Sequence, residues 1–282
     1  MAKKSRLRGY EILEPVGAGA ESIIYRAQEL SSGRIVAVKD VTINSRENRK
    51  YLRHVKNEYA VLKRIHARAR GGALKGVVKA YRLVREGLFR RTKRYALVMD
   101  YVEGRDLRRE RRYPMGQMVD ILTRVAETVA QLHAFGIVHG DLKPENIIVN
   151  ATGAPTLVDF GFSCRAGSSA ASVRGTRDYM APEQVNMGFI TEKTDIYNFG
   201  ATMYFLLTER RIPALLAAQG EASIFIASRY ASTPAPVSIK PQIPKELSDV
   251  ILKCVNQESV RRPSTMKEVL GVLDGARQAY VN

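Results

Sequence analysis

The sequence has few cysteines and no long apolar run, and both absences narrow the classes of protein it can encode. Cys164 and Cys254 are the only cysteines in 282 residues, which is too few for a disulfide framework. The longest strongly apolar segment, around residues 203–207, is far too short to cross a bilayer. The basic start MAKKSRLRG is not followed by the apolar stretch of a signal peptide. We therefore expect a soluble, cytoplasmic protein without a transmembrane segment.

Acidic residues are scarce in the first part of the chain, and this scarcity produces the net charge of +17. Residues 1–112 hold 29 Lys and Arg against 12 Asp and Glu, whereas residues 113–282 hold 16 against 16. Such a positive field favours an acidic protein, nucleic acid or anionic lipid as a partner. An Arg-rich solvated surface with no dedicated partner explains it equally simply, and no interleaved aromatic platform or helix-turn-helix pattern favours nucleic acid.

Two polar motifs stand close together in the middle of the chain: HGDLKPEN at 139–146 and VDFG at 158–161. Asp141 and Asn146 lie five residues apart on a turn-rich loop, and Asp159 follows a short apolar run. Two carboxylates and an amide are the hard oxygen ligands that Mg²⁺ takes together with water and phosphate. Lys143 adds a mobile positive charge where phosphate oxygens would lie. Taken alone, the first motif could also be a polar turn between two strands.

A glycine-rich hairpin and a lysine-ending strand are predicted near the start. Alternation over 12–16 and 22–27 indicates two strands, with Gly17 and Gly19 between them. The run 35–38 indicates a buried third strand that ends in Lys39. Glycines let a backbone approach a phosphate closely, although glycine-rich hairpins alone are common.

A helix is predicted over 44–67, because apolar residues recur there at spacings of three and four. Glu58 lies at the edge of this apolar stripe, where a buried carboxylate needs a cationic partner, and Lys39 is the candidate. The alternative is an ordinary ion pair on the helix surface. Strands over 77–84 and 95–99 and a helix over 117–135 follow, and residues 161–175 are expected to be an aperiodic loop.

In this order and spacing, the motifs resemble those of protein kinases, in particular the serine/threonine branch and its bacterial stand-alone domains. The resemblance implies an α+β fold with two lobes: a small five-stranded β N-lobe with one helix, and a larger, mainly α-helical C-lobe. It covers residues 8–275, with the N-lobe at 8–99, a hinge at 100–104, the C-lobe at 105–275, and short tails at 1–7 and 276–282.

The resemblance also implies roles for individual residues. Asp141 would be the catalytic base, Asn146 and Asp159 would hold Mg²⁺, and Lys143 would steady the transferring phosphoryl group. Lys39 would contact the ATP phosphates and be positioned by Glu58. Thr176, in GTRDYMAPE, would hydrogen-bond near Asp141 and Lys143, and Glu183 would pair with Arg262. The residues expected around the nucleotide are Val16, Gly17, Gly19, Ile24, Ala37, Met99, Asp100, Val102, Asp106 and Ile148.

The chain departs from the family pattern at three positions. Ser22 stands where a third glycine is usual, Gly140 replaces the arginine of H-R-D, and Asn198 replaces a serine. In the usual form that arginine pairs with a phosphorylated residue of the loop at 161–175. Phosphate on Ser168, Ser169 or Ser172 would therefore lack its expected receptor, and activity is predicted not to require it.

The sequence thus predicts an ATP- and Mg²⁺-dependent serine/threonine protein kinase acting on protein substrates. A degraded pseudokinase is disfavoured, since the residues expected to act on the nucleotide are retained. A non-catalytic, kinase-shaped scaffold that binds an acidic protein or nucleic acid through its basic N-lobe is the alternative from another functional class. A small-molecule kinase would share Asp141 and Asp159 but would not be expected to keep GTRDYMAPE.

Overall fold

The structure is a computed structural model, and it describes residues 7–19, 22–42, 49–69, 72–88, 91–110, 113–169, 173, 175–213 and 233–280. The chain divides into two compact units. The first comprises Met1–Glu103 together with Asp159–Gly161, and the second comprises Gly104–Val158 with Phe162–Asn282. The domain boundaries expected from the sequence stay predictions.

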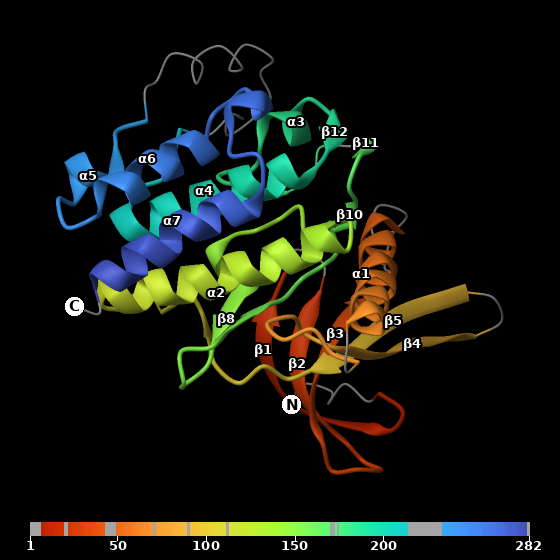
Figure 1. Ribbon diagram of the computed structural model, residues 1–282. Helices are drawn as coiled ribbons and strands as arrows, with labels where there is room; N and C mark the ends of the chain where they lie inside the picture. Colours follow the sequence, from red (N-terminus) through yellow and green to blue (C-terminus); the bar gives the residue numbers. More distant parts are fainter. Residues whose placement is uncertain are drawn as a thin grey trace. The chain divides into compact units, whose positions relative to one another are not determined.

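The first unit contains a five-stranded antiparallel sheet with the strand order β1-β2-β3-β5-β4. Its strands are β1 (Tyr10–Ala18), β2 (Ile23–Glu29), β3 (Ile35–Thr42), β4 (Ala80–Leu88) and β5 (Arg91–Asp100). Helix α1 (Arg49–Arg68) lies against β3, β4 and β5 (Figure 1). The sheet and its helix match the small lobe that the sequence predicts.

Successive side chains along the strands point to opposite faces of the sheet, and both faces carry apolar residues. Val36 and Val38 of β3 pack with Ala96 and Val98 of β5 in one cluster, so the intervening residues point to the opposite face. Lys39 therefore shares its face with Ala37, which is the face that α1 covers. Within α1, three fully buried residues recur at helical spacing: Val55, Leu62 and Ile65.

The second unit is mainly helical. Its longer helices are α2 (Met115–Ala134), α4 (Glu192–Thr208), α6 (Lys245–Cys254) and α7 (Met266–Ala279). Helices α2 and α7 lie side by side, and α4 packs against α6 (Figure 1). Every residue of α4 from Thr194 to Thr208 is buried, so this helix forms the centre of the unit. Gly200 allows the close approach of α6, because a Cβ there would lie 2.4 Å from the Cβ of Cys254.

Short elements connect these helices. Three small sheets are formed by β6 (Arg105–Asp106) with β8 (Ile147–Val149) and β9 (Pro155–Leu157), by β7 (Ile137–Val138) with β10 (Cys164–Arg165), and by β11 (Ser168–Ser169) with β12 (Phe189–Ile190). The short helical turns are η1 (Pro144–Asn146), α3 (Pro182–Val185), α5 (Pro236–Ile239) and η4 (Ser259–Arg261).

The predicted boundaries need corrections. The segment 161–175 is not wholly a loop, because β10 and β11 are strands within it that pair with residues distant in sequence. The described part of the first helix begins at Arg49, and residues 44–48 of the predicted helix lie outside the described residues. The strand predicted from Val77 begins at Ala80. Ser172 also lies outside the described residues. None of the described helices combines the length and hydrophobicity that a membrane span requires.

Candidate active site

In the first unit, three charged side chains expected to act on a nucleotide meet around one ammonium group. Lys39 Nζ lies 2.8 Å from Glu58 Oε2 and 2.8 Å from Asp159 Oδ1. Glu58 is completely buried, whereas the side chain of Asp159 is 38% exposed. Lys39 reaches this point because β3 presents it to the face covered by α1. The cation is thus held between one carboxylate inside the unit and one that solutes can reach.

Opposing effects act on these ionisation states. Burial disfavours the charged form of Lys39, but the charges and hydrogen bonds of Asp159 and Glu58 outweigh burial and raise its pKa. Lys39 therefore stays an ammonium ion at neutral pH. A fixed positive charge at this position is suited to binding phosphate oxygens.

The segment Asp159–Gly161 is held at three points, one on β3 and two on α1. Asp159 contacts Lys39, the N–H of Phe160 donates to Glu58 Oε1 at 3.2 Å, and Asn57 Nδ2 donates to the carbonyl of Gly161 at 3.1 Å. Asp159 adopts a left-handed backbone with φ of 61°, which a non-glycine residue keeps only where its surroundings enforce it. Backbone strain at a solvent-accessible carboxylate is typical of a functional position.

The remaining predicted nucleotide-binding residues of the first unit are spread over the sheet. Gly17 pairs with Ile24 across β1 and β2, and Ala37 pairs with Met99 across β3 and β5. The N–H of Gly19 donates to the carbonyl of Ser22, which closes the described part of the hairpin turn. Val16 and Val102 are half-buried.

The N–H and the carboxylate of Asp100 both form hydrogen bonds within the protein. Its N–H donates to the carbonyl of Lys79, and its carboxylate accepts from the Lys79 N–H and the Tyr81 hydroxyl. A hydrogen bond between the backbone of Asp100 and an adenine base would therefore use the Asp100 carbonyl as the acceptor.

In the second unit, the carboxylate of Asp141 is enclosed by three partners. Lys143 Nζ lies 2.8 Å from its Oδ2, the N–H of Thr176 donates to its Oδ1 at 2.8 Å, and Asn146 Nδ2 lies 3.3 Å from Oδ2. Lys143 also donates to Thr176 Oγ1 at 2.5 Å. Asp141 is only 3% exposed, so its carboxylate is held in one orientation.

Asn146 is oriented by the same loop. Its Nδ2 donates to the backbone carbonyl of Asp141 at 2.8 Å in addition to the carboxylate, so the amide oxygen turns the opposite way. An amide oxygen fixed in this manner is a suitable magnesium ligand. Asp159, the other predicted ligand, offers an accessible carboxylate in the first unit. Each is an oxygen donor of the kind that Mg²⁺ takes, and Mg²⁺ that also binds phosphates usually has one or two protein ligands.

Helix α4 holds the backbone of the two residues that precede Asp141 in the sequence. Asp195, in the first turn of α4, accepts hydrogen bonds from the N–H groups of His139 and Gly140, both at 2.8 Å, and contacts His133 Nε2 at 2.9 Å. These contacts fix the backbone of the loop that carries Asp141.

Asp106 and Ile148 pair across β6 and β8. The carboxylate of Asp106 accepts from the N–H groups of Arg108 and Arg109 at 3.1 and 3.0 Å, which gives it a structural task. Its expected contact with a ribose stays a prediction.

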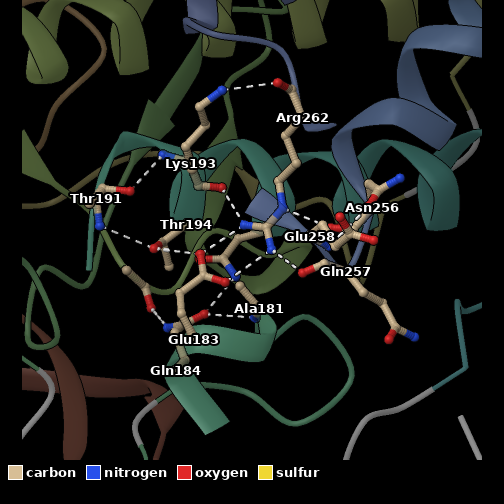
Figure 2. A network of polar contacts seen from close by, with 12 residues as sticks. Ala181, Glu183, Gln184, Thr191, Lys193, Thr194, Asn256, Gln257, Glu258 and Arg262 are labelled. Carbon is tan, nitrogen blue, oxygen red and sulfur yellow. Dashed lines mark hydrogen bonds and ion pairs between the residues drawn. The ribbon is translucent and has the colours of Figure 1, made fainter. Parts of the chain in front are cut away.

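The predicted pair of Glu183 and Arg262 forms (Figure 2). Arg262 NH1 and NH2 lie 2.7 and 3.0 Å from the two carboxylate oxygens, in a bidentate arrangement. The guanidinium is fully buried and also donates to the carbonyls of Asn256, Gln257 and Lys193. This cluster anchors α3 to the segment before α7.

Two polar residues with central positions are absent from the sequence prediction. Asn57 fastens Gly161 to α1, and Gln184 donates to the carbonyl of Gly140 at 2.7 Å. Each stands directly beside a residue that the motifs single out, Glu58 and Glu183. Adjacency is the main sequence signal that either one carries, because the carbonyls to which they donate lie 104 and 44 residues away.

Comparison with known proteins places this geometry in context. Residues 10–272 match the family model described as the protein kinase domain. A probable serine/threonine-protein kinase of Clostridium perfringens is 28% identical over 275 residues, covering 94% of this chain and 38% of that protein. Serine/threonine-protein kinase PrkC of Bacillus subtilis is 28% identical over 270 residues, covering 92% of this chain and 39% of that protein. Serine/threonine-protein kinase Pkn1 of Myxococcus xanthus is 28% identical over 287 residues, covering 98% and 39%. The chain thus spans about two fifths of the length of these curated relatives.

Proposed function

The chain belongs to the protein kinase domain family, and from that premise we propose that it transfers the γ-phosphoryl group of Mg-ATP to serine or threonine hydroxyls of proteins. The family and fold class predicted from the sequence are confirmed. The choice of acceptor is supported by the names of the relatives and by the contact between Lys143 and Thr176.

The arrangement around Asp141 carries the proposal. A buried carboxylate that is held by Lys143, Asn146 and Thr176 has a fixed orientation and can accept a proton from an incoming hydroxyl. Lys143 supplies positive charge beside the same carboxylate, where charge on the transferring phosphoryl group would be neutralised. Because phosphoryl transfer has a loose transition state, positioning and charge neutralisation are the main contributions required of the protein.

We propose that the nucleotide is bound by residues that neutralise the charge of its phosphates and residues that surround its adenine base. Lys39, held by Glu58, would bind phosphate oxygens, and Asp159 and Asn146 would hold Mg²⁺. When bound, Mg²⁺ offsets negative charge on the phosphates. Ala37 and Met99, which pair across the sheet, would contact the adenine with the other apolar residues named above.

Replacement of Asp141 by Asn tests the assignment. The variant keeps the shape and a hydrogen-bonding side chain but cannot accept a proton, so turnover should fall at least about 100-fold. Radiolabel transfer to a generic protein substrate measures turnover, and thermal shift with Mg-ATP measures binding. Binding should change little. A variant that phosphorylates as well as the parent contradicts the role of Asp141, and a parent that binds Mg-ATP without transfer supports the non-catalytic scaffold instead.

We further propose that activity does not require phosphorylation of the segment 161–175. Gly140 lacks the side chain that would receive a phosphate there, and Thr176 already contacts both Asp141 and Lys143. A fully dephosphorylated preparation should therefore turn over at nearly the rate of an autophosphorylated one. A rise of about 100-fold on phosphorylation, equivalent to about 2.7 kcal/mol, would contradict this.

A cytoplasmic location and an acidic protein or nucleic-acid partner for the positive charge of residues 1–112 are proposals from the sequence. The relatives are much longer than this chain, so the activity and partners of a whole protein are likewise proposals.

A further inference from the structure

Two of the three positions at which the chain departs from the usual kinase pattern contact the same buried side chain. Gln184 is 3% exposed, and its Nε2 donates to the carbonyl of Gly140 at 2.7 Å. Asn198, which is 1% exposed, donates through Nδ2 to Gln184 Oε1 at 2.8 Å and to the carbonyl of Tyr179 at 2.6 Å. Gly140 and Asn198 are 58 positions apart in sequence, yet Gln184 joins them.

Its neighbours fix which way the amide of Gln184 points. The N–H of Ala181 donates to Oε1 at 2.9 Å, and Asn198 Nδ2 donates to the same atom. Two donors converging on one atom require that atom to be the oxygen, so the nitrogen must face the carbonyl of Gly140. Figure 2 shows Gln184, which belongs to α3, close to Ala181, the residue directly before that helix.

The bond to Gly140 completes the support of the peptide before Asp141. The N–H of Gly140 is held by Asp195 Oδ1 at 2.8 Å, and its carbonyl is held by Gln184. The carbonyl of Gly140 shares a planar peptide unit with the N–H of Asp141, so fixing one fixes the other. Gly140 adopts a left-handed backbone with φ of 77°.

We propose that Gln184 is a positioning residue that couples the segment 175–185 to the loop at 139–146 through neutral hydrogen bonds. It acts through Gly140 on the orientation of Asp141, and Asn198 holds its amide in the working orientation. The coupling takes the place of the charged contact that an arginine at position 140 and a phosphate would make. For its kinetic consequence, this inference depends on the proposed kinase activity.

The first experiment compares Gln184→Leu with the parent. Leucine has a similar size but no donor, so the buried carbonyl of Gly140 loses its partner. We expect kcat to fall about tenfold, while KM for ATP stays within about twofold, because Gln184 lies outside the proposed nucleotide-binding residues. Gln131→Leu is the matched control: Gln131 is exposed on α2, where its side chain reaches only the carbonyl of Glu127, and kcat should not change.

Gln184→Glu provides a readout that a merely structural role would not move. A buried carboxylate repels the carbonyl of Gly140, but its protonated form regains an O–H donor. The ratio of variant to parent turnover should therefore rise as pH falls from about 8 to about 6. A ratio that is independent of pH, or a Gln184→Leu kcat equal to that of the parent, contradicts the proposal.

Hydrogen exchange separates this inference from the proposed function. In Gln184→Leu the amides of Asp141 and Thr176 should exchange faster, whereas those in the middle of α2 should not. If the parent transfers no phosphate but the exchange pattern changes as described, the positioning role stands and the proposed activity is wrong. If the exchange pattern is unchanged, the positioning role is wrong whatever the activity. Should Gln184→Leu fail to fold, Asn198→Ser, which removes the donor to Gln184 Oε1 and to the carbonyl of Tyr179, must show the same pattern.

Discussion

Gly140 has a backbone conformation that other residues adopt only at a cost. Its φ is 77°, and a Cβ at this position would lie 3.1 Å from the carbonyl oxygen of Phe162. Left-handed conformations are open to glycine and unfavourable for residues with a side chain. The loss of the usual arginine is thus accompanied by a relaxed backbone directly before Asp141.

We therefore predict that Gly140→Ala destabilises the protein by about 1–2 kcal/mol, because the left-handed φ and the close carbonyl both penalise the new methyl group. Chemical denaturation of the purified variant measures the change. Gly271→Ala is the control: this glycine is exposed in α7, nothing lies within 4 Å of its Cβ position, and alanine should stabilise the helix by about 0.5–1 kcal/mol. Equal stability of the Gly140→Ala variant and the parent would show that the loop relaxes without strain.

The sequence could identify position 140 as unusual but could not reveal its conformation. The motif shows only which residue is present, whereas φ depends on the hydrogen bonds that Gly140 donates to Asp195 and accepts from Gln184, which lie 55 and 44 residues away. The same limit applies to Asp159. Its candidate role follows from the motif, but its left-handed φ depends on Lys39, Glu58 and Asn57.

At the scale of elements, the contact between Glu183 and Arg262 anchors α3 to the second unit's helices. The arginine side chain is fully buried and the carboxylate is 16% exposed. A buried ion pair contributes little compared with well-packed apolar groups, but removal of one partner leaves an uncompensated buried charge. The main effect of the pair is therefore to specify where α3 docks, and its net contribution to stability is small.

Accordingly, Glu183→Leu should destabilise the protein by about 3–5 kcal/mol, because it leaves the guanidinium of Arg262 unpaired. The double variant Glu183→Leu/Arg262→Met should recover a large part of that loss, as measured by denaturant unfolding. Glu258→Leu is the matched control, since Glu258 pairs with Arg261 at 2.9 Å on the surface, with both side chains more than half exposed. Its removal should cost less than about 1 kcal/mol. If the double variant is no more stable than Glu183→Leu, the prediction is wrong, and apolar side chains at positions 183 and 262 cannot replace the ion pair.

The predictability of elements followed their length. Helix α2 and strands β3 and β5 carry several turns or alternations of apolar residues, and periodicity locates them to within a few residues. Strands β10 and β11 have two residues each, too few for any period, and they exist because β7 and β12 offer partners. The motifs identify side chains that the structure brings into contact, such as Asp141, Lys143 and Thr176. The supporting amides of Asn57 and Gln184 carry no motif, since the carbonyls to which they donate lie far away in the sequence.

At the scale of the whole molecule, non-local contacts decide how the chain divides. Residues 159–161 belong to the first unit although they follow Glu103 by more than fifty positions. Their bonds to Lys39, Glu58 and Asn57 account for this membership. The distribution of charge does not determine how the chain divides, because the net positive charge of residues 1–112 affects solubility and the choice of partners.

Buried neutral acids give the whole molecule a defined response to alkaline pH. Burial raises the pKa of Cys254 to about 12, with Arg262 opposing, and burial likewise raises the pKa values of Tyr179 and Tyr197 to about 12. In the unfolded chain these groups ionise near their ordinary values of 9.0 for the thiol and 10.0 for the phenols. The folded state therefore holds protons that the unfolded state releases, and stability falls as pH rises.

The full stabilisation from Cys254 should be present below about pH 9 and be lost progressively as pH rises toward 12, at up to about 1.4 kcal/mol per pH unit. Denaturant unfolding at intervals from pH 7 upward measures the slope. Cys254→Ala should lower stability below pH 9 but flatten the slope between about pH 9 and 10, before the tyrosines begin to ionise. Below pH 9 the variant and the parent should run parallel, which provides the internal control. An unchanged slope between pH 9 and 10 in Cys254→Ala would show that the thiol beneath Gly200 is not the group that titrates.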